Sequence, residues 1–174
     1  IVHSEMPQQE DGLLWGFQLW VNLPASHKLC EPRYQDIPPE RIPQVESRGA
    51  VVRVLAGVWD GVRGPVQGIV TDPLYLDVRL LPGGRTSLPI PAGHTAFCYL
   101  FEGEATFGPE EQARPAKAGQ LIALSDGDAL GVAARGGSPA RLLLLAARPL
   151  REPVARNGPF VMNTREEIRQ AFSD

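Results

Sequence analysis

Tyr75-Leu76-Asp77-Val78-Arg79-Leu80-Leu81-Pro82-Gly83-Gly84-Arg85 contains the pattern from which the fold class follows. Leu76, Val78 and Leu80 alternate with two charged residues, and a period of two is typical of a β-strand with one buried and one polar face. The Pro-Gly-Gly that follows favours a turn. The segment therefore predicts a short strand over residues 75–81 that ends in a change of chain direction.

Short apolar runs separated by turns repeat on both sides of this segment. We predict further strands over residues 51–55, 66–70, 86–90, 94–101, 119–125, 129–134 and 140–147. Residues 57–64 are rich in turn formers, and residues 102–104 and 126–128 are predicted as hairpin turns. The 18 glycines and 17 prolines fit a chain with many turns. Many short strands at even spacing predict an all-β sandwich or small barrel.

Composition restricts the class of protein. The chain has 174 residues, 43% hydrophobic and 21% charged, which is typical of one globular domain or one domain plus a fragment. A net charge of −3 without a cluster of Lys and Arg argues against direct nucleic-acid binding. The longest apolar run, residues 142–147, is too short to span a bilayer. With no signal-peptide pattern and only Cys30 and Cys98 as cysteines, we expect reduced thiols and a cytoplasmic location.

The first residues, Ile1-Val2-His3-Ser4-Glu5-Met6-Pro7, carry the side chains best suited to chemistry. In an extended segment, residues i and i+2 leave the same face, so His3 and Glu5 would project side by side. An imidazole and a carboxylate form half of a mononuclear transition-metal site, whose other ligands must come from elsewhere. The alternative is an ordinary surface pair or salt bridge. His27 and Cys30 are a second candidate pair, for which we favour a structural role.

Residues 16–24, Gly-Phe-Gln-Leu-Trp-Val-Asn-Leu-Pro, also alternate and predict a strand. Its apolar face is expected to join a core (Phe17, Leu19, Val21 and Leu23). Its second face is expected either to line a cavity or to be half exposed (Gln18, Trp20 and Asn22). The proline-rich residues 37–43 predict extended geometry without a helix, as in a crossing between two domains.

Three segments in this order resemble the pirin family: residues 1–7, residues 16–24 and Glu31-Pro32-Arg33-Tyr34-Gln35-Asp36. Gly158-Pro159-Phe160-Val161-Met162-Asn163-Thr164 adds a fourth, so the resemblance covers essentially the whole chain. It implies a bicupin, with two β-barrel cupin domains and one metal site in the N-terminal barrel. The family's metal ligands are a His-x-His pair, followed by the His and Glu that match His3 and Glu5. Since no His-x-His occurs here, the front of the first barrel is expected to be missing.

The fold class that the resemblance implies is all-β: a cupin (double-stranded β-helix or jelly-roll barrel). We expect a remnant of the first barrel and the crossing in residues 1–45, a complete second barrel in residues 46–150, and an extension with a short helix in residues 151–174. Where cupin motifs place ligands, residues 87–92, 96 and 120–123 offer no plausible ligand side chain. We therefore expect a metal-free second barrel with a packed interior, and His94 at its rim or in a turn.

The end of the chain predicts its one convincing helix. Thr164-Arg165-Glu166-Glu167 matches a capping box, in which the Thr hydroxyl and the Glu carboxylate each satisfy a free backbone N–H group. Ile168 and Phe172 lie four residues apart and form one apolar stripe. We expect a surface helix that seals a barrel.

Two kinds of function follow from the resemblance. One is an iron-dependent activity of the quercetin 2,3-dioxygenase type in the full-length form, with Fe(II) held by His3 and Glu5 and a flavonol or other small aromatic substrate. Glu5 would then be both metal ligand and catalytic acceptor of the hydroxyl proton. The alternatives are a non-enzymatic regulatory protein that binds a transcription factor or metabolic enzyme, and an inert scaffold with a truncated site. The ligand types alone also permit other divalent metals.

Overall fold

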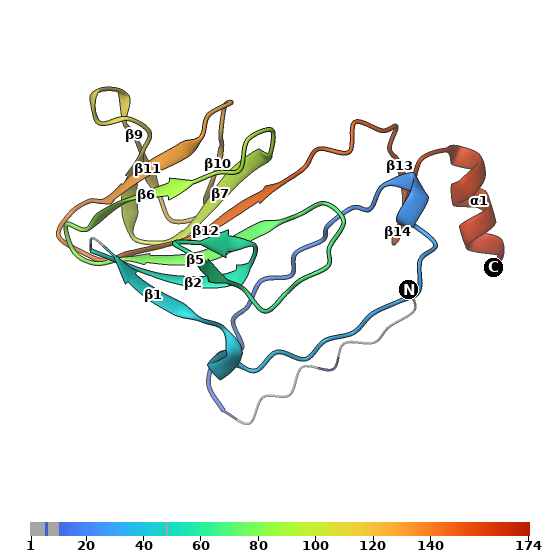
Figure 1. The fold of residues 1–174 in the computed structure, drawn as a ribbon, viewed down its shortest axis with the longest axis horizontal. Helices are drawn as coiled ribbons and strands as arrows, with labels where there is room; N and C mark the ends of the chain where they lie inside the picture. The colour runs from blue at the N-terminus through green and yellow to red at the C-terminus, as the bar shows by residue number, and fades with distance from the viewer. Residues whose placement is uncertain (1–5, 7–10, 48) are drawn as a thin grey trace. The chain divides into compact units, whose positions relative to one another are not determined.

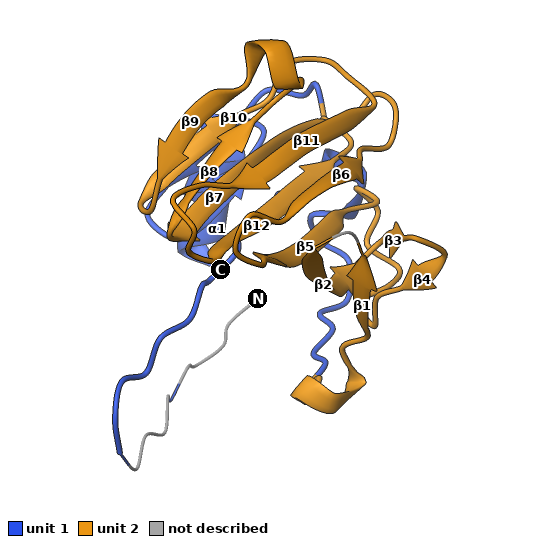
Figure 2. Ribbon diagram, turned by 90° about the vertical axis from the view of Figure 1, so that its left-hand side faces the viewer, with its two compact units in different colours: residues 1–35, 151–174 blue, residues 36–150 orange. Residues whose placement is uncertain are grey.

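The structure is a computed structural model that describes residues 6, 11–47 and 49–174. The chain divides into two compact units, coloured separately in Figure 2. The first comprises residues 1–35 and 151–174, and the second comprises residues 36–150. All the strands predicted between residues 51 and 147 fall within the second unit.

The larger sheet of the second unit has six strands in the order β1-β2-β5-β12-β7-β10 (Figure 1). They are β1 (Gln44–Ser47), β2 (Ala50–Ala56), β5 (Leu74–Leu80), β12 (Ala140–Ala147), β7 (Thr95–Glu102) and β10 (Gln120–Ala123). Neighbouring strands are antiparallel throughout. The central strand β12 has Leu144 opposite Leu76 of β5 and Cys98 of β7, which sets the register of the apolar positions.

The smaller sheet has four antiparallel strands in the order β6-β11-β8-β9. They are β6 (Arg85–Pro89), β11 (Ala129–Ala134), β8 (Glu104–Phe107) and β9 (Arg114–Lys117). The two sheets form the layers of the unit (Figure 2), and apolar side chains from both join one buried cluster. Leu76, Leu100 and Leu144 come from the larger sheet, and Leu88 and Leu130 come from the smaller one. The predicted all-β barrel class is therefore confirmed.

Two strands show how the sequence pattern relates to burial. β5 alternates as predicted, because its leucines and Val78 are buried while Tyr75, Asp77 and Arg79 lie on the other face. β12 does not alternate, because Leu143 and Leu145 are buried as well as the core residues Leu142, Leu144 and Ala146. A strand that is buried on both faces has a continuous run of apolar residues in its sequence. This burial explains why residues 142–147 are all apolar.

Some of the predicted connections differ in the structure. Residues 66–70 do not form a strand: Val66 makes only an isolated bridge to Ala56, and Gly68, with φ of 70°, interrupts the extended backbone. The turn-rich residues 57–64 contain a small hairpin of β3 (Val58–Trp59) and β4 (Val62–Arg63). The proline-rich segment contains a 3₁₀ helix, Pro39–Arg41, because proline is well tolerated at the first position of a helix.

The predicted hairpin turns at residues 102–104 and 126–128 are corners between the sheets. β7 and β8 flank Gly103 but belong to different sheets, and the same holds for β10 and β11 on either side of residues 126–128. A glycine-rich turn looks the same in sequence whether the chain folds back on one sheet or crosses to the other. The prediction of hairpins was wrong for this reason.

Within the first unit, residues 16–24 are not assigned as a strand. Phe17, Leu19 and Val21 are 45%, 40% and 43% exposed, so the prediction that this face joins a core is wrong in this structure. A 3₁₀ helix, Ala25–His27, follows. Among the described residues of this unit, the assigned strands are β13 (Ala155–Asn157) and β14 (Phe160–Met162), which pair with each other.

The predicted C-terminal helix is confirmed as α1 (Arg165–Ser173). Glu167 N donates to Thr164 Oγ1 (3.1 Å) and Thr164 N donates to Glu167 Oε2 (2.8 Å), which completes the capping box. Ile168 is buried, whereas Phe172 is half exposed and meets the ring of Phe160 edge-on at 4.9 Å. α1 packs against β13 and β14. In the described part of the chain, no helix combines the length and apolar character needed to cross a membrane.

The capping box should make the stability of α1 depend on pH. Hydrogen bonds from the backbone N–H groups of Asn163 and Thr164 lower the pKa of Glu167. A lowered pKa in the folded state means that the stabilisation is present above the unfolded pKa, about 4.3, and is lost as the pH falls through the folded value. We expect the amide protection factors of α1, measured by NMR hydrogen exchange, to fall on acidification in the native chain but not in Glu167→Gln.

Glu166→Gln is the matched control for this experiment. Glu166 is the neighbouring first-turn carboxylate, and its partner is Arg169 in the next turn, at 3.2 Å. This variant should keep the pH dependence of the native chain. Equal pH profiles for Glu167→Gln and the native chain would contradict the assignment to Glu167.

Candidate functional site

His3 and Glu5, the predicted metal ligands, lie outside the described residues, so their arrangement stays a prediction. The second candidate pair begins at His27, the last residue of the 3₁₀ helix of the first unit. His27 Nδ1 is 2.8 Å from Ser26 Oγ, the carbonyl oxygen of His27 accepts the N–H of Cys30, and Cys30 is an exposed free thiol. The described residues contain no group of three or more His, Cys, Asp or Glu placed to hold a metal ion. These contacts of His27 and Cys30 are local, and their structural role stays a prediction.

The interior of the second unit is filled by apolar side chains at the positions where a cupin motif would have ligands. Leu88 and Ala96 belong to the buried cluster, and Ile122 packs against it. Cys98 is fully buried, and this burial raises its pKa to about 12. The thiol therefore stays protonated at neutral pH. The described residues on their own do not fit the iron that the family resemblance implies.

His94 lies in the turn before β7, as predicted. Its backbone N–H donates a hydrogen bond to the carbonyl oxygen of Pro91 across this turn, and its side chain is almost fully buried. Nε2 donates to the carbonyl oxygen of Asp72 at 2.9 Å, and the Asp72 carboxylate pairs with Arg148 at 3.1 Å. These contacts join three chain segments at one end of the barrel, which is a structural role.

The polar face predicted for residues 16–24 has a local role at Asn22. Asn22 Oδ1 accepts a hydrogen bond from the ammonium group of Lys28 (2.7 Å). The same ammonium group donates a hydrogen bond to the carbonyl oxygen of Val161 (3.1 Å). Glu152 Oε2 accepts hydrogen bonds from the backbone N–H of Ala25 (2.8 Å) and from the side-chain amide of Asn163 (3.0 Å). Both networks tie residues 22–28 to residues 152–163 within the first unit. Trp20, on the same predicted face as Asn22, is largely exposed.

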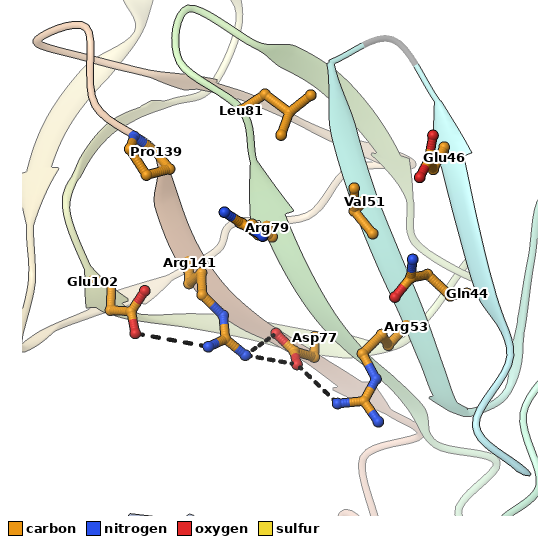
Figure 3. Close-up of a pocket in the computed structure, with 10 residues that line it drawn as sticks. All are labelled: Gln44, Glu46, Val51, Arg53, Asp77, Arg79, Leu81, Glu102, Pro139 and Arg141. Carbon is orange, nitrogen blue, oxygen red and sulfur yellow. Dashed lines mark hydrogen bonds and ion pairs between the residues drawn. The ribbon is translucent and has the colours of Figure 1, made fainter. Parts of the chain in front are cut away.

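A cavity of about 670 Å³ lies on the second unit, over the outward faces of β1, β2, β5 and β12 (Figure 3). Its polar side chains come from neighbouring strands and from the end of β7. They are Gln44, Glu46, Arg53, Asp77, Arg79, Glu102 and Arg141. The cavity therefore lies on the face of the sheet opposite the barrel core.

Asp77 is the centre of an ion-pair network in this cavity. Its carboxylate is 3.1 Å from Arg141 Nη2 and 3.9 Å from Arg53 Nη1, so one acid links strands β2, β5 and β12. Arg141 Nη1 lies 3.7 Å from Glu102, and its guanidinium lies 4.9 Å from the centre of the Phe101 ring. No local sequence pattern predicted this cluster. The one feature of the sequence that could have indicated the cluster is the pair of charged residues, Asp77 and Arg79, in a strongly apolar strand. On its own, this pair indicates only that one face of the strand is solvated.

The same network affects one further titratable group. Tyr75 precedes Asp77 by two residues on the outward face of β5. Burial, and secondarily the negative charge of Asp77, raise the pKa of Tyr75. The phenol is therefore neutral at physiological pH.

Comparison with known proteins places this architecture in a family. The model of the pirin C-terminal cupin domain matches residues 75–174. A Pseudomonas aeruginosa protein provisionally named a quercetin 2,3-dioxygenase is 45% identical over 100% of this chain and 62% of its own length. Pirin from Homo sapiens is 41% identical over 100% of this chain and 59% of its own length. A crystal structure of quercetin 2,3-dioxygenase from Acinetobacter baumannii matches with a TM-score of 0.81 and 30% identity, over 89% of this chain and 53% of that chain.

The chain spans about three fifths of the length of these two relatives, 62% and 59%. The matching family model extends over more than half of the chain and includes most strands of the barrel. The resemblance noted in the four sequence segments and the expected cupin fold are therefore confirmed, and the chain belongs to the pirin family.

Proposed function

We propose that the full-length protein containing this chain is a metal-binding cupin that acts on a flavonol or related small aromatic molecule, as a quercetin 2,3-dioxygenase does. The observation that carries this proposal is the structural match to the Acinetobacter quercetin 2,3-dioxygenase, which extends over 89% of this chain. The provisional name of the Pseudomonas relative, at 45% identity, supports the same activity.

In this proposal His3 and Glu5 are two ligands of Fe(II), and the remaining ligands lie in the part of the longer relatives that this chain does not span. The spacing in His3-Ser4-Glu5 supports this role. A bound iron would supply Lewis-acid activation and orientation of the substrate. Glu5 would accept the proton of the substrate hydroxyl.

Substitution of either proposed ligand tests this function. His3→Ala and Glu5→Ala in the full-length protein should each weaken iron binding by about tenfold or more, since losing even an outer partner of a ligand typically costs 10–100-fold. Oxygen uptake with quercetin should fall to background. Iron content is measured by elemental analysis and oxygen uptake with an oxygen electrode. His27→Ala is the control that should leave both unchanged, because His27 is an exposed residue with only local contacts.

The outcomes separate the alternatives. Full iron content in His3→Ala or Glu5→Ala would contradict the ligand assignment. Iron retention by the native protein without oxygen uptake would favour a non-enzymatic regulatory role that involves a partner protein. Absence of iron from the native full-length protein would favour an inert scaffold. Iron in the full-length protein but not in residues 1–174 alone would place the missing ligands outside this chain.

A further inference from the structure

We propose that the cavity over β1, β2, β5 and β12 binds the carboxylate of a small organic acid, with Arg79 as its main contact. This site lies on the outward face of the larger sheet and is independent of the iron site proposed above. It uses residues of the second unit alone.

The first argument is the position of Arg79. In the register of the sheet, Arg79 of β5 is directly opposite Arg141 of β12, with Val51 of β2 on its other side. Like charges directly opposite each other destabilise an antiparallel pair. Within the described residues, Arg79 has no acidic group at ion-pair distance, and its side chain is exposed. Figure 3 shows Arg79 in the cavity between Arg141 and Leu81. An anion at this position would relieve the repulsion.

Arg141 can contribute a second contact. Its Nη atoms face Asp77 and Glu102, but its Nε is buried without an acceptor in the described part of the chain. Guanidinium has five N–H donors in a planar fork, and its best partners are carboxylates and phosphates. The Arg141 side chain is 33% exposed, so its remaining Nη protons are accessible to an anion that bridges Arg79 and Arg141.

The lining selects a singly charged organic acid. Three arginines (Arg53, Arg79 and Arg141) are balanced by three acids (Glu46, Asp77 and Glu102), so the lining has no surplus positive charge to offset a second negative charge on the ligand. Val51, Leu81 and Pro139 provide an apolar wall beside the arginines. The volume of about 670 Å³ lies within the range of small-molecule sites, roughly 300–1,000 Å³. An apolar body that carries one carboxylate fits both parts of this lining.

Titration with benzoate tests the proposal, using isothermal calorimetry or NMR chemical shifts on the chain at low salt. Arg79→Gln should weaken benzoate binding by about tenfold, the effect of losing a hydrogen bond to a charged group. Arg85→Gln is the matched control, because Arg85 is also an exposed strand arginine but lies on the smaller sheet and pairs with Glu110 at 3.7 Å. It should bind benzoate as the native chain does.

Glu102→Gln tests the proposal in the opposite direction. Glu102 is a partly exposed partner of Arg141, so its neutralisation removes a repulsive charge and frees a donor. Benzoate should bind about two- to fivefold more tightly, as expected for one exposed ion pair. A gain of affinity cannot result from misfolding.

The proposal fails if the native chain shows no benzoate binding up to about 20 mM. It also fails if Arg79→Gln binds as tightly as the native chain, or if Arg85→Gln loses as much affinity. Inorganic phosphate is the comparison ligand. Equal affinity for phosphate and benzoate would overturn the selection of an organic acid by the apolar wall.

Discussion

Replacing Leu144 by alanine should destabilise the second unit by about 3–5 kcal/mol. Leu144 is 0% exposed in the central strand β12, opposite Leu76 and Cys98, and it belongs to the core shared by both sheets. Truncation removes apolar burial and leaves a cavity that the neighbouring strands cannot easily fill. Because whole domains are stable by only about 5–15 kcal/mol, this is a large share. Urea unfolding followed by the fluorescence of the buried Trp59 measures the loss.

Leu121→Ala is the control for this prediction. It makes the same chemical change on strand β10, where Leu121 is 61% exposed. Its effect should stay within about 0.5 kcal/mol, as for surface substitutions in general. If the two variants lose the same stability, the position of Leu144 in the core is wrong.

The strands most visible in the sequence are those whose apolar runs have glycine or proline within two residues of each end. The predicted bounds of residues 129–134 and 140–147 are those of β11 and β12. β8 and β9 were not predicted, because polar residues interrupt both and β9 includes Pro115, whereas β10, of the same length, has a continuous apolar run over residues 121–123. The sheet that each strand joins could not be predicted either, since an identical turn serves a hairpin and a corner.

The candidate sites differ in what the sequence could show. His3 and Glu5 can be predicted as a ligand pair because their pattern is local, and they stay a prediction. The cavity depends on β-sheet register, which places Arg79 opposite Arg141 and brings Asp77 between Arg53 and Arg141. These residues come from three strands that are distant in sequence. No local pattern distinguishes an arginine without an acidic partner from an ordinary solvated one.

Gly103 is the position where a single added methyl group should have the second large effect. It joins β7 of the larger sheet to β8 of the smaller one, with φ of 73°, a region that glycine adopts readily. A Cβ atom there would overlap the carbonyl oxygen of Pro139 and lie 3.1 Å from the Cα of Ala140. These atoms are backbone at the start of β12, so they cannot move without disturbing the central strand. We expect Gly103→Ala to destabilise the second unit by about 2–5 kcal/mol in urea unfolding.

Gly136→Ala separates the two causes of this effect. Gly136 has a φ of 70°, close to that of Gly103, but a Cβ there would have no atom within 4 Å. This variant should lose only about 1–2 kcal/mol, the cost of a left-handed backbone for a residue with a side chain. The difference between the variants then measures the close contact with Pro139 and Ala140. Equal losses would mean that backbone conformation alone requires the glycine. A larger loss at Gly103 would mean that the corner depends on close backbone packing, which lets the chain leave one sheet at Glu102 and enter the other at Glu104.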